Sequence, residues 1–188
     1  MPFSHSTQLS AIVGLIERLQ PHSMLDVGVG MGQYGFLART NLENVNLFIV
    51  DGAQAVQSAK SDWKVRIDGI EAFKTYQTPV HDYAYNHIYW DDTQKTLPTI
   101  PDNQYELIIA VDILEHFTVE DGIEFLGHLK RIAEKKVLVS TPKTFMHQEI
   151  EANPYENHRS LWTQEQLEEQ GFTQFIDNEE SWIAVCST

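Results

Sequence analysis

The chain has little cysteine, few basic side chains and no long apolar run. Cys186 is the only cysteine among 188 residues, so no internal disulfide can form and a reducing compartment is favoured. No apolar run approaches the roughly 18 residues of a membrane span. The polar segment 1–8 does not resemble a secretory signal. We therefore expect a cytoplasmic protein without a membrane segment.

Basic side chains are outnumbered, with 13 lysines and arginines against 27 aspartates and glutamates and a formal net charge of −14. The imbalance is strongest between residues 149 and 180, where nine acidic side chains accompany one arginine, Arg159. A surface of this sign repels phosphate backbones, and no basic stripe compensates for it elsewhere. Nucleic acids and anionic membranes are thus disfavoured as partners. Much of the acidity also suits simple solubility.

The composition is that of an ordinary globular protein, with 42% hydrophobic and 11% aromatic residues. The length is sufficient for one domain with its own core, and no repeat or linker divides residues 1–188. Apolar residues at helical spacing predict an N-terminal helix within residues 1–21. Ser6 or Thr7 is available to cap this helix, and Pro21 lies beyond its end.

The rest of the chain alternates strand-like and helix-like segments. Residues 105–111 are almost continuously apolar, which is typical of a strand buried on both faces of a parallel sheet. The last two strands are separated by a short acidic turn and must be antiparallel. The remaining expected elements are strands at 24–27, 45–50, 64–70, 88–90, 137–139, 173–176 and 182–186, and helices at 33–40, after Thr118 and after Thr163. This order predicts a three-layer α/β/α sandwich with a Rossmann-like, mostly parallel seven-stranded sheet and an antiparallel C-terminal strand.

Residues 24–35, Met-Leu-Asp-Val-Gly-Val-Gly-Met-Gly-Gln-Tyr-Gly, are the most informative segment. An apolar strand carrying Asp26 leads into Gly28, Gly30 and Gly32 before a helix-like stretch. Glycine at such a turn lets the backbone bend sharply and lets a ligand approach where a Cβ would collide. Ligands of open α/β sheets bind outside the carboxyl ends of the strands. We expect a nucleoside-containing cofactor at that edge, near Asp112.

Three segments together resemble the class I S-adenosylmethionine-dependent methyltransferases, from about residue 22 onward. Residues 25–32 are similar to the first motif of that family, 111–117 (Val-Asp-Ile-Leu-Glu-His-Phe) to the fourth, and 137–142 (Val-Leu-Val-Ser-Thr-Pro) to the fifth. Segments 66–73 and 158–163 are similar to those of small bacterial members whose function is mostly unassigned. The resemblance implies methyl transfer to a small-molecule acceptor, with S-adenosylmethionine as cofactor and S-adenosylhomocysteine as product.

The resemblance also implies which residues bind the cofactor. In the family, the glycine turn lies near the amino-acid end of the cofactor. An acid after the second strand holds the ribose hydroxyls through charge-assisted hydrogen bonds, and another acid after the third strand meets the adenine amine. Carried onto this chain, the cofactor-binding positions are Asp26, Gly28, Gly30, Gly32, Glu71, Asp92 and Asp112.

Two acids compete for the ribose. Asp51 follows an apolar segment about 20 residues after the turn, as in many nucleotide sites. Glu71 lies in surroundings that match the family better. Asp92 follows it by 21 residues and Asp112 follows Asp92 by 20, as expected for strand–helix units of equal length. We choose Glu71 and treat residues 41–63 as an insertion. Asp91 rivals Asp92 for the adenine, and either acid can instead be a residue of a strand-end turn.

Methyl transfer from a sulfonium needs alignment and exclusion of water. It needs a general base only where the acceptor must lose a proton. His116 is the first choice for that base because the reference pKa of histidine lies near neutrality, and Asp112 and His158 are the other catalytic candidates. The alternative is that Glu115 and His116 only support the following helix.

The long connection at 143–162 is the expected acceptor-binding loop. Tyr155, His158 and Arg159 are its candidate substrate residues, although Arg159 can equally form a surface ion pair. A metal site can be imagined from Asp112, Glu115, His116, His147 and His158. Their spacing follows no known ligand pattern, so no metal is expected.

Two other functions compete with methyl transfer. Gly30, Gly32 and Gly35 satisfy the Gly-x-Gly-x-x-Gly pattern of NAD(P)-dependent oxidoreductases, a weak signal alone. Asp26 lies two residues before Gly28, and the C-terminal hairpin is reversed; both features disfavour that class. The other competitor is a non-catalytic cofactor-binding protein of the same fold, which the complete set of glycines and acids disfavours. The sequence leaves the acceptor and the oligomeric state open.

Overall fold

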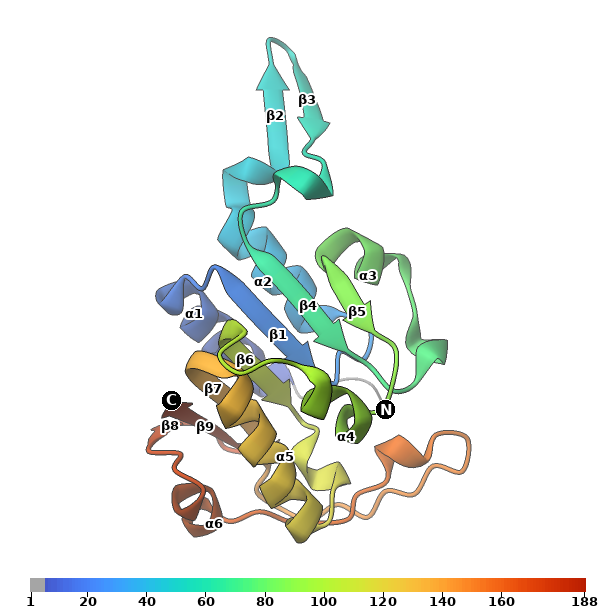
Figure 1. Cartoon of the computed structure of the whole chain (residues 1–188), viewed down its shortest axis with the longest axis vertical. Helices are drawn as coiled ribbons and strands as arrows, with labels where there is room; N and C mark the ends of the chain where they lie inside the picture. The colour runs from blue at the N-terminus through green and yellow to red at the C-terminus, as the bar shows by residue number, and fades with distance from the viewer. Residues whose placement is uncertain (1–5) are drawn as a thin grey trace.

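The structure is a computed structural model that describes residues 6–188. Helices cover both faces of a seven-stranded sheet, which gives three layers (Figure 1). The strands are β1 (Ser23–Val27), β4 (Arg66–Ile70), β5 (His87–Tyr89), β6 (Tyr105–Val111), β7 (Ala133–Pro142), β8 (Gln174–Ile176) and β9 (Ser181–Ser187). Their order in space is β5-β4-β1-β6-β7-β9-β8. The pairs from β5 to β7 are parallel, and β9 runs antiparallel to both of its neighbours, β7 and β8. The predicted fold class is confirmed.

The two faces of the sheet carry separate hydrophobic cores. Helices α1 (Leu9–Leu19), α2 (Gln33–Glu43) and α3 (Pro79–Ala84) pack on one face, and α5 (Val119–Ile132) and α6 (Gln164–Glu169) on the other. In β6, Ile108 belongs to the α5 side and Ile109 to the α1 side, and both are fully buried. This explains why the sequence of β6 is apolar without alternation. None of the helices within residues 6–188 is long and apolar enough to cross a bilayer.

Local sequence determines where several helices begin. The Thr163 hydroxyl accepts a hydrogen bond from the backbone N–H of Gln166, whose side chain accepts one from Thr163 in return, so α6 begins with a capping box. Thr118 likewise caps α5. The predicted cap of α1 is wrong. Neither Ser6 nor Thr7 caps it; Gln8 stands at that position, and its side chain makes no capping bond because it is turned into the protein.

The segment between α2 and β4 forms a hairpin outside the main sheet. Strands β2 (Phe48–Asp51) and β3 (Gln54–Gln57) pair only with each other, and all of their residues are exposed. The hairpin projects beyond the amino end of β4 (Figure 1), away from the residues that follow its carboxyl end. The strand predicted at 45–50 therefore begins at Phe48 instead and does not belong to the main sheet. Asp51 lies in this exposed hairpin.

Two helical glycines provide a matched test of the packing. A Cβ at Gly35 in α2 would lie 2.0 Å from Cζ of the buried Tyr85, whereas a Cβ at Gly127 in α5 would meet nothing within 4 Å. We expect Gly35→Ala to lower the free energy of unfolding by about 1–3 kcal/mol through overpacking. Gly127→Ala should raise it by about 0.5–1 kcal/mol because the unfolded chain loses freedom. Urea unfolding followed by circular dichroism measures both, and equal stabilities would refute the packing described at Tyr85.

Candidate functional site

A cavity of about 230 Å³ lies where the parallel strands end. Its wall comes from the turn after β1, the residues after β4, the short helix α4 (Thr93–Thr96), the segment after β6 and the loop 143–162. The cavity thus lies at the carboxyl edge of the sheet, where α/β folds bind their ligands. Its lining includes five acidic residues, and Arg159 is the one lysine or arginine among the described lining residues.

The glycine turn has the tight conformation that its sequence predicts. Gly28, Gly30 and Gly32 have φ values of 79°, 55° and 88°, a region that side chains other than glycine rarely adopt. A Cβ at Gly28 would lie 2.8 Å from Cδ1 of Ile113. Gly28 and Gly30 line the cavity, whereas Gly32 lies against Val80 and contributes no part of the wall.

Glu71 joins the ends of β4 and β1. Its carboxylate accepts hydrogen bonds from the backbone N–H of Gly30 at 2.8 Å and of Phe73 at 2.7 Å. The side chain is buried and lines the cavity. Burial raises the pKa of Glu71, and the backbone donors oppose that rise. Glu71 is therefore placed both to hold the glycine turn and to face a ligand.

Asp92 follows β5 and also lines the cavity. Its carboxylate accepts the backbone N–H of Gln94 at 2.8 Å, so it caps α4 at the same time. Its neighbour Asp91 is exposed, lies 3.6 Å from the ammonium of Lys95, and takes no part in the wall. Of the two rivals, only Asp92 is in place to meet a ligand.

Asp26 lies behind the cavity and does not line it. The Tyr85 hydroxyl donates to its carboxylate at 2.6 Å and accepts the backbone N–H of Gly35 at 3.1 Å. Burial raises the pKa of Asp26 to about 7. Asp26 thus ties β1 to α2 and to the residue that follows α3, and it supports the turn from beneath. Its part in cofactor binding stays a prediction.

Asp112 follows β6 with a φ of 51°, in the left-handed region. Its carboxylate accepts hydrogen bonds from the Ser140 hydroxyl at 2.8 Å and from the side-chain amide of Gln8. The Gln8 amide oxygen also contacts the Ser140 hydroxyl, and Gln8 is fully buried. The segment before α1 therefore helps to fix one wall of the cavity. Sequence patterns did not reveal this role of Gln8, because the contact depends on tertiary structure.

His116 lines the cavity beside Asp112. Its ring centre lies 5.1 Å from that of His158, which is near the cavity but does not line it. Burial lowers the pKa of His116 below its ordinary range, which favours the neutral ring. A neutral imidazole can accept a proton or ligate a metal.

The loop 143–162 closes the cavity through a bridge of polar side chains. The Tyr76 hydroxyl contacts both the Glu156 carboxylate and the Asn153 amide at 3.0 Å, which joins the loop to the segment after Glu71. Tyr155 and Arg159 line the cavity, and Arg159 forms no ion pair with any residue of 6–188. Tyr76 and Glu156 were not predicted as site residues, because nothing in the sequence joins positions 80 residues apart.

Solved structures share this architecture. Magnesium protoporphyrin IX methyltransferase from Synechocystis PCC 6803 with bound SAH has a TM-score of 0.62 at 13% identity, covering 96% of this chain and 81% of that chain. A SAM-dependent methyltransferase from Archaeoglobus fulgidus has a TM-score of 0.60 at 12% identity, covering 95% of this chain and 94% of that chain. One from Aquifex aeolicus has a TM-score of 0.59 at 16% identity, covering 96% of this chain and 93% of that chain. No protein-family model and no curated protein sequence matches. The chain therefore has the fold of class I S-adenosylmethionine-dependent methyltransferases.

The buried Asp26 carboxyl makes stability depend on pH. Its pKa is raised from 3.8 to about 7 in the folded state, so the folded state binds the proton more tightly. Its contribution to stability therefore decreases as the pH rises from about 4 to about 7. Asp26→Asn keeps an acceptor for Tyr85 but removes this titration. We expect the variant to be more stable relative to wild type at pH 7.5 than at pH 5, that is, its free energy of unfolding minus that of wild type should be larger at pH 7.5.

Urea unfolding at the two pH values measures this difference, with Asp51→Asn in the exposed hairpin as the control. A variant whose relative stability is the same at both pH values would show that Asp26 is not titrating in this range.

Proposed function

We propose that this chain is a methyltransferase that binds S-adenosylmethionine in the cavity and transfers its methyl group to a small-molecule acceptor. One observation supports this most strongly. The glycine turn, Glu71 and Asp92 stand together at the carboxyl ends of three adjacent strands, β1, β4 and β5. The neighbours crystallised with SAM and SAH have the same fold.

The chemistry of the cavity wall fits this cofactor. S-adenosylmethionine carries a sulfonium and an ammonium, which carboxylates stabilise, and it supplies a methyl group activated by the positive sulfur. The acidic lining residues are Glu71, Asp92, Asp112, Asp121 and Glu156. Glu71 is the proposed acceptor of the ribose hydroxyls, and Asp92 of the adenine amine. The diphosphate of NAD(P) would face the same carboxylates and be repelled, which disfavours an oxidoreductase.

The residues around the acceptor side have three tasks in this proposal. The loop carrying Tyr155, His158 and Arg159 holds the acceptor in line with the methyl group and keeps water out. Asp112, fixed by Gln8 and Ser140, faces the positive end of the cofactor. His116, whose pKa burial lowers, receives a proton where the acceptor must lose one.

Calorimetric titration with S-adenosylhomocysteine tests the cofactor assignment. Glu71→Ala and Asp92→Ala should each weaken binding at least about tenfold, because a hydrogen bond to a charged group contributes about 1.5–3 kcal/mol. Asp51→Ala and Asp91→Ala are the matched controls, since neither residue lines the cavity. We expect both controls to bind like wild type.

If Asp51→Ala binds S-adenosylhomocysteine more weakly than Glu71→Ala does, the assignment of Glu71 as the ribose acid is refuted. A parallel titration with NADH addresses the rival class. If NADH binds more tightly than S-adenosylhomocysteine, the chain is an oxidoreductase and the proposal fails. Methyl transfer itself is tested by incubation with radiolabelled S-adenosylmethionine and fractionated metabolites, where labelled product is expected.

A further inference from the structure

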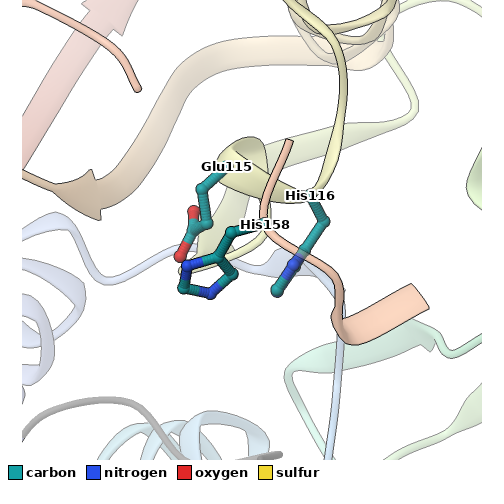
Figure 2. A group of neighbouring side chains, drawn as sticks. All are labelled: Glu115, His116 and His158. Atoms are coloured by element: carbon teal, nitrogen blue, oxygen red, sulfur yellow. The ribbon is translucent and has the colours of Figure 1, made fainter. Parts of the chain in front are cut away.

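Three side chains with metal-binding atoms meet beside the cavity: Glu115, His116 and His158 (Figure 2). Glu115 and His116 belong to a short 3-10 turn after β6, and His158 comes from the loop 143–162. One ligand atom of each lies within 4.8 Å of the other two. In Figure 2 the Glu115 carboxylate lies next to the His158 ring, with the His116 ring on the other side.

The Glu115 carboxylate is buried in acidic surroundings. It is 4% exposed, and it accepts a hydrogen bond from the Thr141 hydroxyl at 3.2 Å. Burial raises the pKa of Glu115 well above its ordinary value, and the neighbouring charges of Asp112 and Glu156 raise it further. No lysine or arginine of residues 6–188 pairs with Glu115. A bound cation would supply the missing positive charge.

Both imidazole rings are held as metal-binding histidines are held. Nδ1 of His116 lies 3.3 Å from the carbonyl oxygen of Asn157, and Nδ1 of His158 lies 2.7 Å from that of Met146. A carbonyl oxygen only accepts, so Nδ1 carries the proton in each ring and Nε2 keeps its lone pair. A backbone carbonyl on the far nitrogen fixes the tautomer and strengthens the ring as a ligand.

The backbone joins the two segments that supply these side chains. The N–H groups of Arg159 and Ser160 both donate to the carbonyl oxygen of Glu115, at 2.8 and 3.2 Å. His158 is therefore held against the 3-10 turn by its own neighbours in the chain. The cluster depends on these fixed contacts and not on a chance approach of mobile side chains.

We propose that Glu115, His116 and His158 bind a divalent transition-metal ion such as Zn²⁺. Two imidazoles and one carboxylate are a common set for catalytic zinc and leave a coordination position open. Ligand atoms of a tetrahedral zinc lie about 3.4 Å apart, given metal–ligand bonds of about 2.1 Å. The three ligand atoms lie within 4.8 Å of one another, so small side-chain movements bring them to that spacing. Because His116 also lines the cavity, the ion lies at its wall.

Such an ion limits the chemical class of the methyl acceptor, a consequence that rests on the proposed methyl transfer. An acceptor hydroxyl in the open position becomes more acidic and releases its proton to water. The oxygen then attacks the methyl carbon while the carbon–sulfur bond breaks, and the bonding electrons return to sulfur to give neutral S-adenosylhomocysteine. His116 then acts as a ligand, and the acceptor is an oxygen nucleophile.

The test is a calorimetric titration of Zn²⁺ into the full chain after dialysis against a chelator. We expect one strong site in wild type, and a loss of affinity of at least about tenfold in His158→Ala and in Glu115→Gln. His147→Ala is the matched control, because His147 is exposed in the same loop, lies beside Glu149 and is outside the cluster. It should bind Zn²⁺ like wild type.

Absence of a strong site in wild type would overturn the inference, and so would an equal loss in His147→Ala. Urea unfolding followed by circular dichroism reports whether His158→Ala is folded. The two proposals are separable: S-adenosylhomocysteine binding without a zinc site overturns the metal ion alone. A zinc site without S-adenosylhomocysteine binding overturns the methyl transfer alone.

Discussion

The carboxylate of Glu71 is the constraint on which the cavity depends. It holds the backbone N–H of Gly30, in the turn after β1, and the N–H of Phe73, two residues beyond itself. These two bonds join the carboxyl ends of two neighbouring strands and keep the turn in a conformation that needs glycine. Gly30 is bound from the other side as well, since its carbonyl oxygen lies 3.0 Å from Nε2 of His81. The wall is thus formed before any ligand arrives, as binding sites usually are.

Burying ionised carboxylates at this edge of the sheet lowers the stability of the protein, and such groups indicate a functional site. Asp26 and Glu71 are buried carboxyls with raised pKa values, and Glu115 is a third. Carboxyl groups with raised pKa values concentrate at functional sites, where a bound ligand can compensate for the loss of hydration. Asp26 lies behind the cavity with Tyr85 as its partner, whereas Glu71, Asp92 and Asp112 line the cavity itself. A ligand with positive charge suits that arrangement, and the same charge disfavours phosphate-rich ligands.

Much of the fold could be predicted because burial on two faces leaves a direct signature. The limits of β6 agree with its apolar run at both ends, and Thr118 and Thr163 start their helices as their sequences predict. The exposed β2–β3 hairpin has no such signature, because no core selects its side chains. Its first strand was therefore predicted too early in the chain.

The site could be predicted where function resides in a local motif, and not where it depends on distant contacts. The glycine turn, Glu71, Asp92, Asp112 and His116 do stand at one cavity. The contact of Gln8 with Asp112 joins residues 104 apart, and that of Tyr85 with Asp26 joins residues 59 apart. The grouping of His158 with Glu115 and His116 likewise requires the fold, since hydrogen bonds between distant segments bring that loop to the turn.

The most direct test of the central claim is a crystal structure of the chain grown with S-adenosylhomocysteine. The account predicts electron density for the nucleoside in the cavity, with the ribose at Glu71, the adenine near Asp92 and the amino-acid end at the glycine turn. Density for the ligand elsewhere on the molecule, or a cavity filled by its own side chains at saturating ligand, would contradict it.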